Sequence, residues 1–245
     1  MSNQFSIFLK KKVVGTEKNL ISLDEPYAQM QKIARSHDVK VIIDAGASNA
    51  RISKRLLDFF PGSHVHAFEP NTKLYKEPLD ALALQEPRFH PYYIALSDHA
   101  GKADLHITES PGATSLLKES ECMKEHGFSG TAVERIEQVE LTTIDQWARQ
   151  NAPDGVHLMK FDIQGAEIQA LKGAAEVLHD STLLVYIEVW FNPVYQGSTL
   201  LSEVDILMRK HGFLFYDLFK PRYSSKGLLL WANVIYAHGA RLGLV

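Results

Sequence analysis

Carboxylate side chains recur where the apolar segments of this chain end. Five such segments give way to an acid, or to a serine followed by an acid. The residues are Asp44, Glu69, Ser97 with Asp98, Asp162 and Glu188. If the segments are parallel strands, their carboxyl ends meet at the sheet edge where α/β proteins bind ligands. Carboxylates there can accept hydrogen bonds from hydroxyls, attract cations and act as general bases. The pattern therefore predicts a polar ligand site at one sheet edge.

The first acid opens a loop of small residues. Residues 44–50 read Asp-Ala-Gly-Ala-Ser-Asn-Ala. A dinucleotide-binding loop has the pattern G-x-G-x-x-G, and here only Gly46 matches, with Ser48 and Arg51 in the other two places. The charge of Asp44 would also repel a pyrophosphate. The loop therefore favours a ligand with positive groups.

S-adenosylmethionine (SAM) is such a ligand, since it carries an ammonium and a sulfonium group and no phosphate. Glu69 ends the second segment, where a carboxylate can accept hydrogen bonds from both ribose hydroxyls. Ser97 or Asp98, after the third segment, is expected to contact the adenine amino group. The residues thus predict SAM as the cofactor.

These acids share an edge only if the segments before them are neighbouring strands. Apolar and β-branched runs predict strands at 41–45, 63–70, 89–98, 156–165 and 182–191. Helical spacing predicts helices at 25–37, 49–60, 166–178 and 202–211. Two final strands, 213–220 and 228–238, are joined only by a loop and cannot be parallel neighbours. We predict an α/β fold, doubly wound, with a mostly parallel seven-stranded sheet and a reversed C-terminal strand.

The chain of 245 residues suits one large domain with embellishments. We expect an N-terminal arm and helix over residues 1–40 and the ligand-binding domain over 41–245. An inserted loop or lid is expected at about 103–140. Within it, residues 109–131 are rich in Gly, Ser and charge, which is typical of a mobile loop, and His106 and Thr114–Ser115 lie in this insertion.

The composition limits the partners. The net charge of −3 lacks the basic character of a nucleic-acid binder, and no apolar run is long enough to span a membrane. The single cysteine, Cys122, excludes an internal disulfide and fits a cytoplasmic protein. The eleven histidines show no i, i+4 pair, so no metal site is predicted. The oligomeric state stays open.

Several motifs resemble the FkbM-type methyltransferases. VIIDAGAS, HAFEPN, ALSD-x-x-G, LTTIDQWA, MKFDIQGAEIQALKGA and YIEVW occur in the order seen in that family, over about residues 40–190. The resemblance implies a SAM-dependent class I (Rossmann-like) fold and methyl transfer to a hydroxyl of a small molecule or sugar. It implies that the methionine part lies on Asp44, Gly46 and the backbone of Ala47, Ser48 and Asn49. It also places the ribose on Glu69 near Asn71, and the adenine edge on Ser97 and Asp98.

The chain departs from the family pattern at three positions. Ser48 replaces the usual Asn of the loop, and Ala50 replaces its last Gly. We expect SAM binding to persist, because alanine is tolerated at a helix start. Gln164 stands where the family has Glu, which removes a charge beside Asp162.

Asp162 is the predicted general base, since it ends the strand that faces the cofactor. Lys160 shares its face by the period of two and could orient Asp162 or lower its pKa, or the two form only a structural pair. Glu188 interrupts an apolar strand and needs a partner, as a substrate ligand or a structural anchor. Trp190, Phe191 and Asn192 after it are a candidate substrate wall.

Two other functions stay open at this stage. A nicotinamide-dependent oxidoreductase uses a similar sheet, although the missing glycines argue against it. A non-catalytic SAM-binding protein is the second alternative, favoured by Ser48, Ala50 and Gln164. The sequence leaves the identity of the methyl acceptor undetermined.

Overall fold

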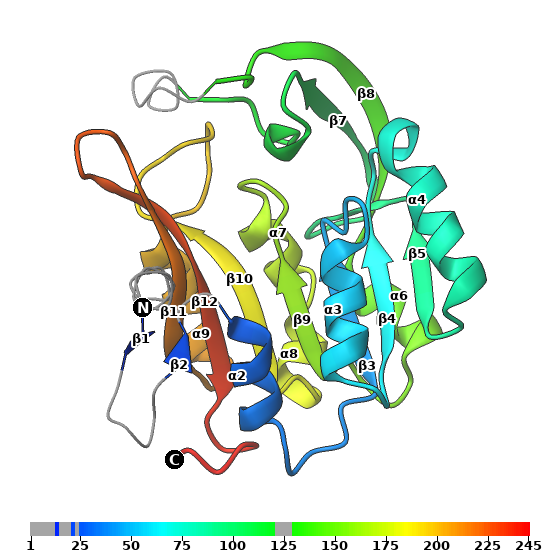
Figure 1. Ribbon diagram of the computed structural model, residues 1–245, viewed down its shortest axis with the longest axis vertical. Helices are drawn as coiled ribbons and strands as arrows, with labels where there is room; N and C mark the ends of the chain where they lie inside the picture. Colours follow the sequence, from blue (N-terminus) through cyan, green and yellow to red (C-terminus); the bar gives the residue numbers. More distant parts are fainter. Residues whose placement is uncertain (1–12, 15–20, 23–24, 121–128) are drawn as a thin grey trace, which may run out of the picture.

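The computed structural model describes residues 13–14, 21–22, 25–120 and 129–245 (Figure 1). Two short strands near the N-terminus, β1 (Val13–Val14) and β2 (Ile21–Ser22), pair with each other antiparallel. The rest of the predicted arm before residue 25 lies outside the described residues, as does Cys122.

A seven-stranded sheet forms the centre of the molecule. Its order is β11 (Phe213–Tyr223), β12 (Leu229–His238), β10 (Leu184–Trp190), β9 (Leu158–Phe161), β3 (Val41–Ala45), β4 (His64–Phe68) and β5 (Phe89–Tyr92). The five strands from β10 to β5 are parallel, and β12 runs antiparallel to both β10 and β11. The predicted fold class, including the reversed last strand, is confirmed.

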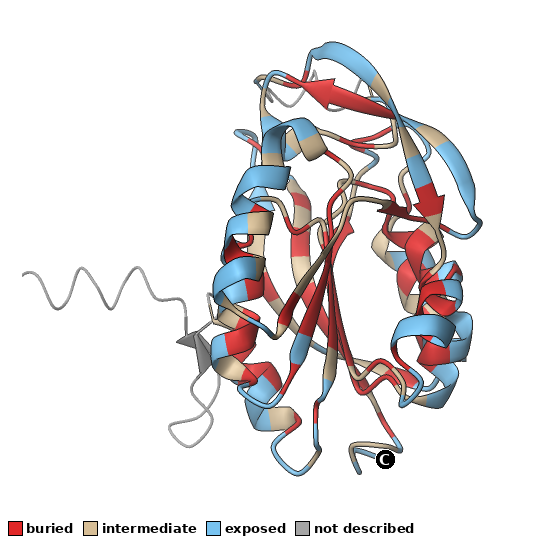
Figure 2. Cartoon of the chain, turned by 90° about the vertical axis from the view of Figure 1, so that its right-hand side faces the viewer, coloured by how far each residue is buried: buried red, intermediate tan, exposed pale blue. Residues whose placement is uncertain are grey.

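Helices cover both faces of the sheet, and Figure 2 shows their buried sides turned toward the strands. One core lies between the sheet and the helices α2 (Pro26–Ile33), α3 (Arg51–Phe59) and α4 (Thr72–Gln85). The other core involves α6 (Ile144–Asn151), α7 (Glu167–Lys172), α8 (Ala175–Asp180) and α9 (Leu201–Lys210). Strands buried on both faces are near-continuously apolar, which explains the sequence of β10.

The predicted strand 89–98 is two strands in two sheets. β5 ends at Tyr92, whose partner Phe68 is the last residue of β4, so no neighbour remains in the large sheet beyond it. The chain therefore leaves the sheet, and β6 (Ala95–Leu96) pairs with β8 (Val133–Thr142) instead. β8 also pairs with β7 (Gly101–Thr108), and Figure 1 shows these two strands arching over the upper end of the sheet.

Two helix predictions differ from the structure. The expected single helix at 166–178 is divided into α7 and α8 at Gly173, where a Cβ atom would lie 2.1 Å from the carbonyl oxygen of Ser97. The helix α4 was not predicted. Pro78 lies inside it and weakens the local helical signal, while burial of Leu79 and Leu82 against the sheet stabilises it.

Candidate active site

A cavity of about 290 Å³ lies at the carboxyl ends of β3, β4 and β9. Eight of the predicted site residues line it, namely Gly46, Ala47, Ser48, Asn49, Glu69, Asn71, Lys160 and Asp162. Apolar and aromatic side chains complete the wall, among them Phe68, Tyr75, Ile94 and Leu96. The cavity thus lies at the sheet edge where the strand-end acids predicted a ligand.

Gly46 brings the loop against the end of β9. Its φ is +75°, and a Cβ atom there would lie 2.0 Å from the carbonyl oxygen of Asp162. The backbone N–H groups of Gly46 and Ala47 both donate to the carbonyl of Phe68, at 2.9 and 3.2 Å. Glycine is required here both for the left-handed backbone and for the close approach.

Asp44 and Lys160 form a buried ion pair of 2.9 Å. The two residues are register partners on the neighbouring strands β3 and β9, so their side chains emerge side by side. The Lys160 ammonium also donates to the carbonyls of Ala45 and Gly46, at 3.2 and 3.0 Å. Burial lowers the pKa of Lys160, but the charges of Asp44 and Asp162 outweigh it and leave that pKa above its usual value.

This pair differs from the expectation for both residues. The hydroxyl of Ser53 donates to the second oxygen of Asp44 at 2.6 Å, and Asp44 is absent from the cavity lining. Lys160, predicted to act on Asp162, is bound instead to Asp44 and to the loop carbonyls. The ion pair therefore holds the loop of residues 44–50 against the end of β9.

Glu69 ties the loop to the end of β4. Its two carboxylate oxygens accept hydrogen bonds from the backbone N–H groups of Ser48 and Asn71, both at 2.9 Å. Burial raises the pKa of Glu69, and these two hydrogen bonds oppose the shift. Each oxygen keeps a further lone pair for a hydroxyl donor, and Glu69 lines the cavity.

The side chain of Asn71 provides a second polar contact. The residue is 1% exposed and lines the cavity. Neither its amide nitrogen nor its amide oxygen has a hydrogen-bond partner among the described residues. Buried polar groups are normally paired, so an amide without a partner is unusual in this wall.

Ser97 and Asp98 lie apart from these residues. Neither lines the cavity, Asp98 is exposed, and its carboxylate accepts hydrogen bonds from Ser97 and His99. Their neighbours Ala95 and Leu96, which form β6, line the cavity instead. This placement gives no support to the adenine contact predicted for the pair.

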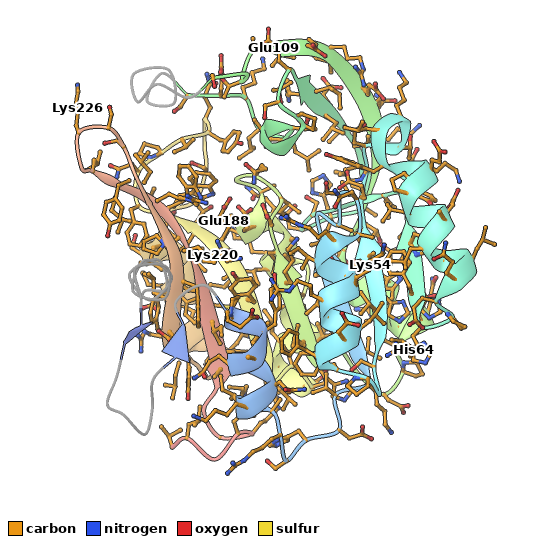
Figure 3. The ribbon with its side chains drawn as sticks, viewed as in Figure 1. Lys54, His64, Glu109, Glu188, Lys220 and Lys226 are labelled. Atoms are coloured by element: carbon orange, nitrogen blue, oxygen red, sulfur yellow. The ribbon has the colours of Figure 1, made fainter. Side chains whose placement is uncertain are left out.

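A second cavity, of about 240 Å³, adjoins the first. Gly112 and Gln164 line both cavities, and the second is lined further by Glu188, Trp190, Tyr195 and Trp231. Figure 3 shows Glu188 at the upper end of β10, beside the turn that precedes α7. Two of the predicted wall residues lie elsewhere, since the Phe191 side chain packs against the core and the Asn192 amide donates to the carbonyl of Leu229.

Gln164 connects the acids at the boundary of the two cavities. Its amide nitrogen donates to Asp162 at 2.7 Å and to Glu188 at 3.3 Å. Its amide oxygen accepts a hydrogen bond of 2.8 Å from the hydroxyl of Tyr195. Burial, with the nearby charge of Asp162, raises the pKa of Glu188 well above its usual value.

The inserted segment forms hydrogen bonds with the residues at the boundary of the two cavities. The hydroxyl of Ser115 donates to the carbonyl of Gln164 at 2.6 Å. The backbone N–H of Ser120 donates to the carbonyl of Val194, and that of Gln196 to the carbonyl of Lys118. The described part of the predicted mobile loop is therefore bound to the turn before α7 and to the segment after β10.

The family model described as the methyltransferase FkbM domain matches residues 44–215. The chain belongs to this family. It is a methyltransferase, and its methyl donor is S-adenosyl-L-methionine, as the residues predicted. Within the loop of the family motif, residues 45–49 line the first cavity together with Glu69, and the second cavity lies beside it.

The chain is also similar to curated and solved methyltransferases. The chain is 25% identical to the 2-O-methyltransferase NoeI of Sinorhizobium fredii, over 67% of this chain and 69% of that protein. It is 28% identical to the methyltransferase sdnD of Sordaria araneosa, over 70% and 73% of the two chains. A solved N1-methyltransferase of Burkholderia thailandensis is 11% identical with a TM-score of 0.44, over 97% of this chain and 83% of that chain.

The departures of this methyltransferase from the family motif have structural consequences. Ser48 and Ala50 take left-handed backbone conformations, with φ of 50° and 61°. Ala50 precedes the first turn of α3 and provides no side-chain cap, while the Asn49 side chain accepts a hydrogen bond from the backbone of Arg51. The loop thus keeps the glycine-like backbone at Ala50 without a glycine.

Sequence reasoning missed three features of the second cavity, namely Tyr195, Trp231 and the bridging amide of Gln164. The sequence indicated Gln164 only as a lost charge. Tyr195 lies in an irregular segment without periodicity, and Trp231 lies in the last strand, far along the chain from Glu188. Only the pairing of β12 with β10, which places Trp231 opposite Trp190, brings it to the site.

No helix in the described part of the chain is long and apolar enough to cross a membrane.

Proposed function

We propose that this methyltransferase transfers the methyl group of SAM to a hydroxyl of a small molecule or sugar, with Asp162 as the general base. The observation that carries the proposal is the position of Asp162 at the wall of the first cavity, joined through one amide to Glu188 at the second. A methyl group on SAM in the first cavity would face an acceptor in the second across this boundary. The name of the relative NoeI, a 2-O-methyltransferase, supports oxygen as the acceptor atom.

Each cofactor-site residue has a proposed role that follows from its contacts. Gly46, Ala47, Ser48 and Asn49 surround the methionine part, and Glu69 with the unpartnered amide of Asn71 binds the ribose and the adjoining part of the adenosine. Asp44 and Lys160 hold the loop in place. Asp44 itself does not contact the cofactor. Alignment of the nucleophile with the methyl and sulfonium is the main requirement, because SAM itself supplies the reactive group.

Asp162 has the chemistry of a base for a hydroxyl nucleophile. One of its oxygens accepts a hydrogen bond from the Gln164 amide, which restrains the carboxylate, and we assign the other oxygen to the substrate hydroxyl. Proton removal by such a carboxylate contributes about 10²- to 10⁴-fold to rate in general. Glu188 accepts a hydrogen bond from the same amide and is proposed to contact the methyl acceptor.

Methyl transfer from tritium-labelled SAM to pooled hydroxylated acceptors, fractionated by chromatography, tests this proposal. We expect label in an ether product, and Asp162→Asn should reduce turnover by at least about 100-fold while SAM affinity changes less than about threefold. Equal turnover of the variant would remove Asp162 from catalysis. SAM binding without labelled product from any pool would favour a non-catalytic member.

The setting and the domain organisation of the protein are also proposals. We propose a cytoplasmic protein without nucleic-acid partners, on the single cysteine and the net charge of −3. We further propose residues 41–245 as the SAM-binding methyltransferase domain, preceded by the arm and helix of residues 1–40, with an inserted loop or lid at about 103–140.

A further inference from the structure

The second cavity has an aromatic wall built from three elements. Trp190 ends β10, Trp231 lies opposite it on β12, and Tyr195 comes from the segment after β10. The Trp190 and Trp231 rings are 5.4 Å apart and tilted by 40°, and Tyr195 meets Trp190 edge to face at 5.5 Å. Their mutual packing restricts the rings, so they form a preformed surface for a flat ligand face.

Polar groups of both kinds lie on the same cavity. Trp190 is 3% exposed, and its indole N–H has no hydrogen-bond partner among the described residues. Glu188 and Gln164 also line the cavity, and Ser110, Ser129 and Thr131 supply hydroxyl-bearing side chains at its rim. Buried donors are normally paired, so an indole N–H without a partner is unusual in this wall.

The described lining holds no lysine or arginine. Its one carboxyl group, Glu188, adjoins Asp162 through Gln164, so the described part of the wall offers no charge complementary to a phosphate or carboxylate. An anionic ligand would lose its hydration here without a cation from the described lining, and it would face the charge of Asp162. Burial also favours the neutral form of Glu188, which then presents a hydroxyl donor and a carbonyl acceptor and has little attraction for an ammonium group.

We propose that the second cavity is the acceptor site and that it binds a neutral, hydroxylated ring such as a pyranoside. The C–H face of the ring would pack on Trp190 and Trp231, and its hydroxyls would bond to the indole N–H, Glu188 and Gln164. The acceptor is then a finished glycoside or polyol rather than a sugar phosphate or a nucleotide sugar. This inference rests on the proposed function, since it names the substrate class of that same site.

Intrinsic fluorescence gives a direct test, because two of the three tryptophans line this cavity. The third, Trp147, lies in α6 and packs on His66, Phe68 and Tyr92, so Trp147→Phe provides a background in which the signal comes from the acceptor site alone. Calorimetry first measures binding of S-adenosylhomocysteine (SAH), the product of the donor. At saturating SAH, the probes are methyl glucopyranoside, methyl rhamnopyranoside, methyl fucopyranoside, inositol, and the 1-phosphates of glucose and fucose.

We expect at least one neutral probe to quench the fluorescence saturably in the millimolar range, with the 1-phosphates at least tenfold weaker. Trp231→Ala should lower the affinity for that probe at least tenfold, and Trp231→Phe should retain much of the affinity. The affinity for SAH should be unchanged in both variants. The exposed Tyr216→Phe is the matched control.

Three results would overturn the inference: no binding of any neutral probe to a protein that binds SAH, phosphates that bind as tightly as the glycosides, or full affinity in Trp231→Ala. If the unaltered chain does not bind SAH, that result would count against the proposed function instead. In that case glycoside quenching measured without SAH still decides the chemistry of the second cavity.

Discussion

The amide nitrogen of Gln164 donates to the carboxylate of Asp162 at 2.7 Å, two residues away across a turn. Gln164 takes a left-handed backbone conformation with φ of 56°, which folds its side chain back toward the preceding acid. The same nitrogen reaches Glu188, and Tyr195 holds the amide oxygen on the other side. The amide donates hydrogen bonds to two acidic side chains, Asp162 and Glu188, whereas the carboxylate of a glutamate at this position would repel them.

Gln164→Glu should therefore lower activity at neutral pH and shift the pH–rate profile upward. The third carboxylate removes the shared donor and adds like charge, which raises the pKa of the base. When that pKa lies above the assay pH, each further rise of one unit in the pKa lowers the ionised fraction of the base by about tenfold, so we expect at least that loss at about pH 7. The profile of kcat/KM with labelled SAM measures it, and the exposed Gln146→Glu is the control. A profile that does not move would exclude the amide from any electrostatic role.

Gly46→Ala should abolish SAM binding. The new Cβ atom would lie 2.0 Å from the Asp162 carbonyl oxygen, and the left-handed backbone is strained for alanine. We expect affinity for SAH to fall by at least about 100-fold, which corresponds to roughly 3 kcal/mol. Calorimetry measures it, and Gly62→Ala is the matched control because no atom lies within 4 Å of the position that a Cβ would take there. Retained affinity would mean that the loop moves away from β9 at little cost.

Glu69→Gln should weaken SAM binding about 10- to 100-fold. The substituted amide must turn an N–H₂ group toward the N–H of either Ser48 or Asn71, so one of the two hydrogen bonds to the loop is lost. Calorimetric titration with SAH measures the affinity, and Glu77→Gln on the exposed face of α4 is the control. Equal affinity in the two variants would remove the proposed ribose contact.

Lys160→Met should destabilise the fold by about 3–5 kcal/mol, because it leaves the Asp44 carboxylate buried without its cation. Urea unfolding followed by circular dichroism measures the loss. Adding Asp44→Asn to the same chain should recover a large part of it, since the uncompensated charge is then gone. Lys54→Met, on the exposed face of α3, should change stability by less than about 0.5 kcal/mol. If the double variant is no more stable than Lys160→Met, the ion pair is not the cause.

The buried carboxyl of Glu167 should make stability fall between about pH 4.5 and 7. Burial raises its pKa from 4.5 to about 7, although its carboxylate accepts a hydrogen bond from the backbone of Ile163. The folded state then binds more protons than the unfolded state in this window, so this contribution to stability is fully present below pH 4.5 and is lost as the pH rises through 7. The contribution is about 3 kcal/mol.

Glu167→Gln keeps an acceptor for the Ile163 N–H and removes the titration. Urea unfolding at pH 4.5, 5.5, 6.5 and 7.5 should therefore show a flatter pH dependence than in the unaltered chain. Glu140→Gln, an exposed site on β8, should leave the slope unchanged. The same slope in Glu167→Gln would assign the pH dependence to other groups.

Apart from the missed helix α4, features that depend on local patterns match the sequence predictions, and two features that depend on distant partners do not. The strand–loop–helix units and the reversed last strand follow from periodicity and loop length, and both are observed. The prediction of one strand at 89–98 was wrong because its length depends on where β4, a different segment, ends. The prediction of one helix at 166–178 was wrong because the break at Gly173 depends on the distant carbonyl of Ser97.

By itself, the sequence determined the fold class, the cofactor and the edge of the sheet where the first cavity lies. These follow from repeating patterns and from residue types that local geometry places at strand ends. The tertiary structure alone decided that Lys160 pairs with Asp44, that Gln164 joins Asp162 to Glu188, and that Trp231 forms one wall with Trp190. Such contacts depend on the register between strands far apart in the chain, and no local pattern of residues encodes that register.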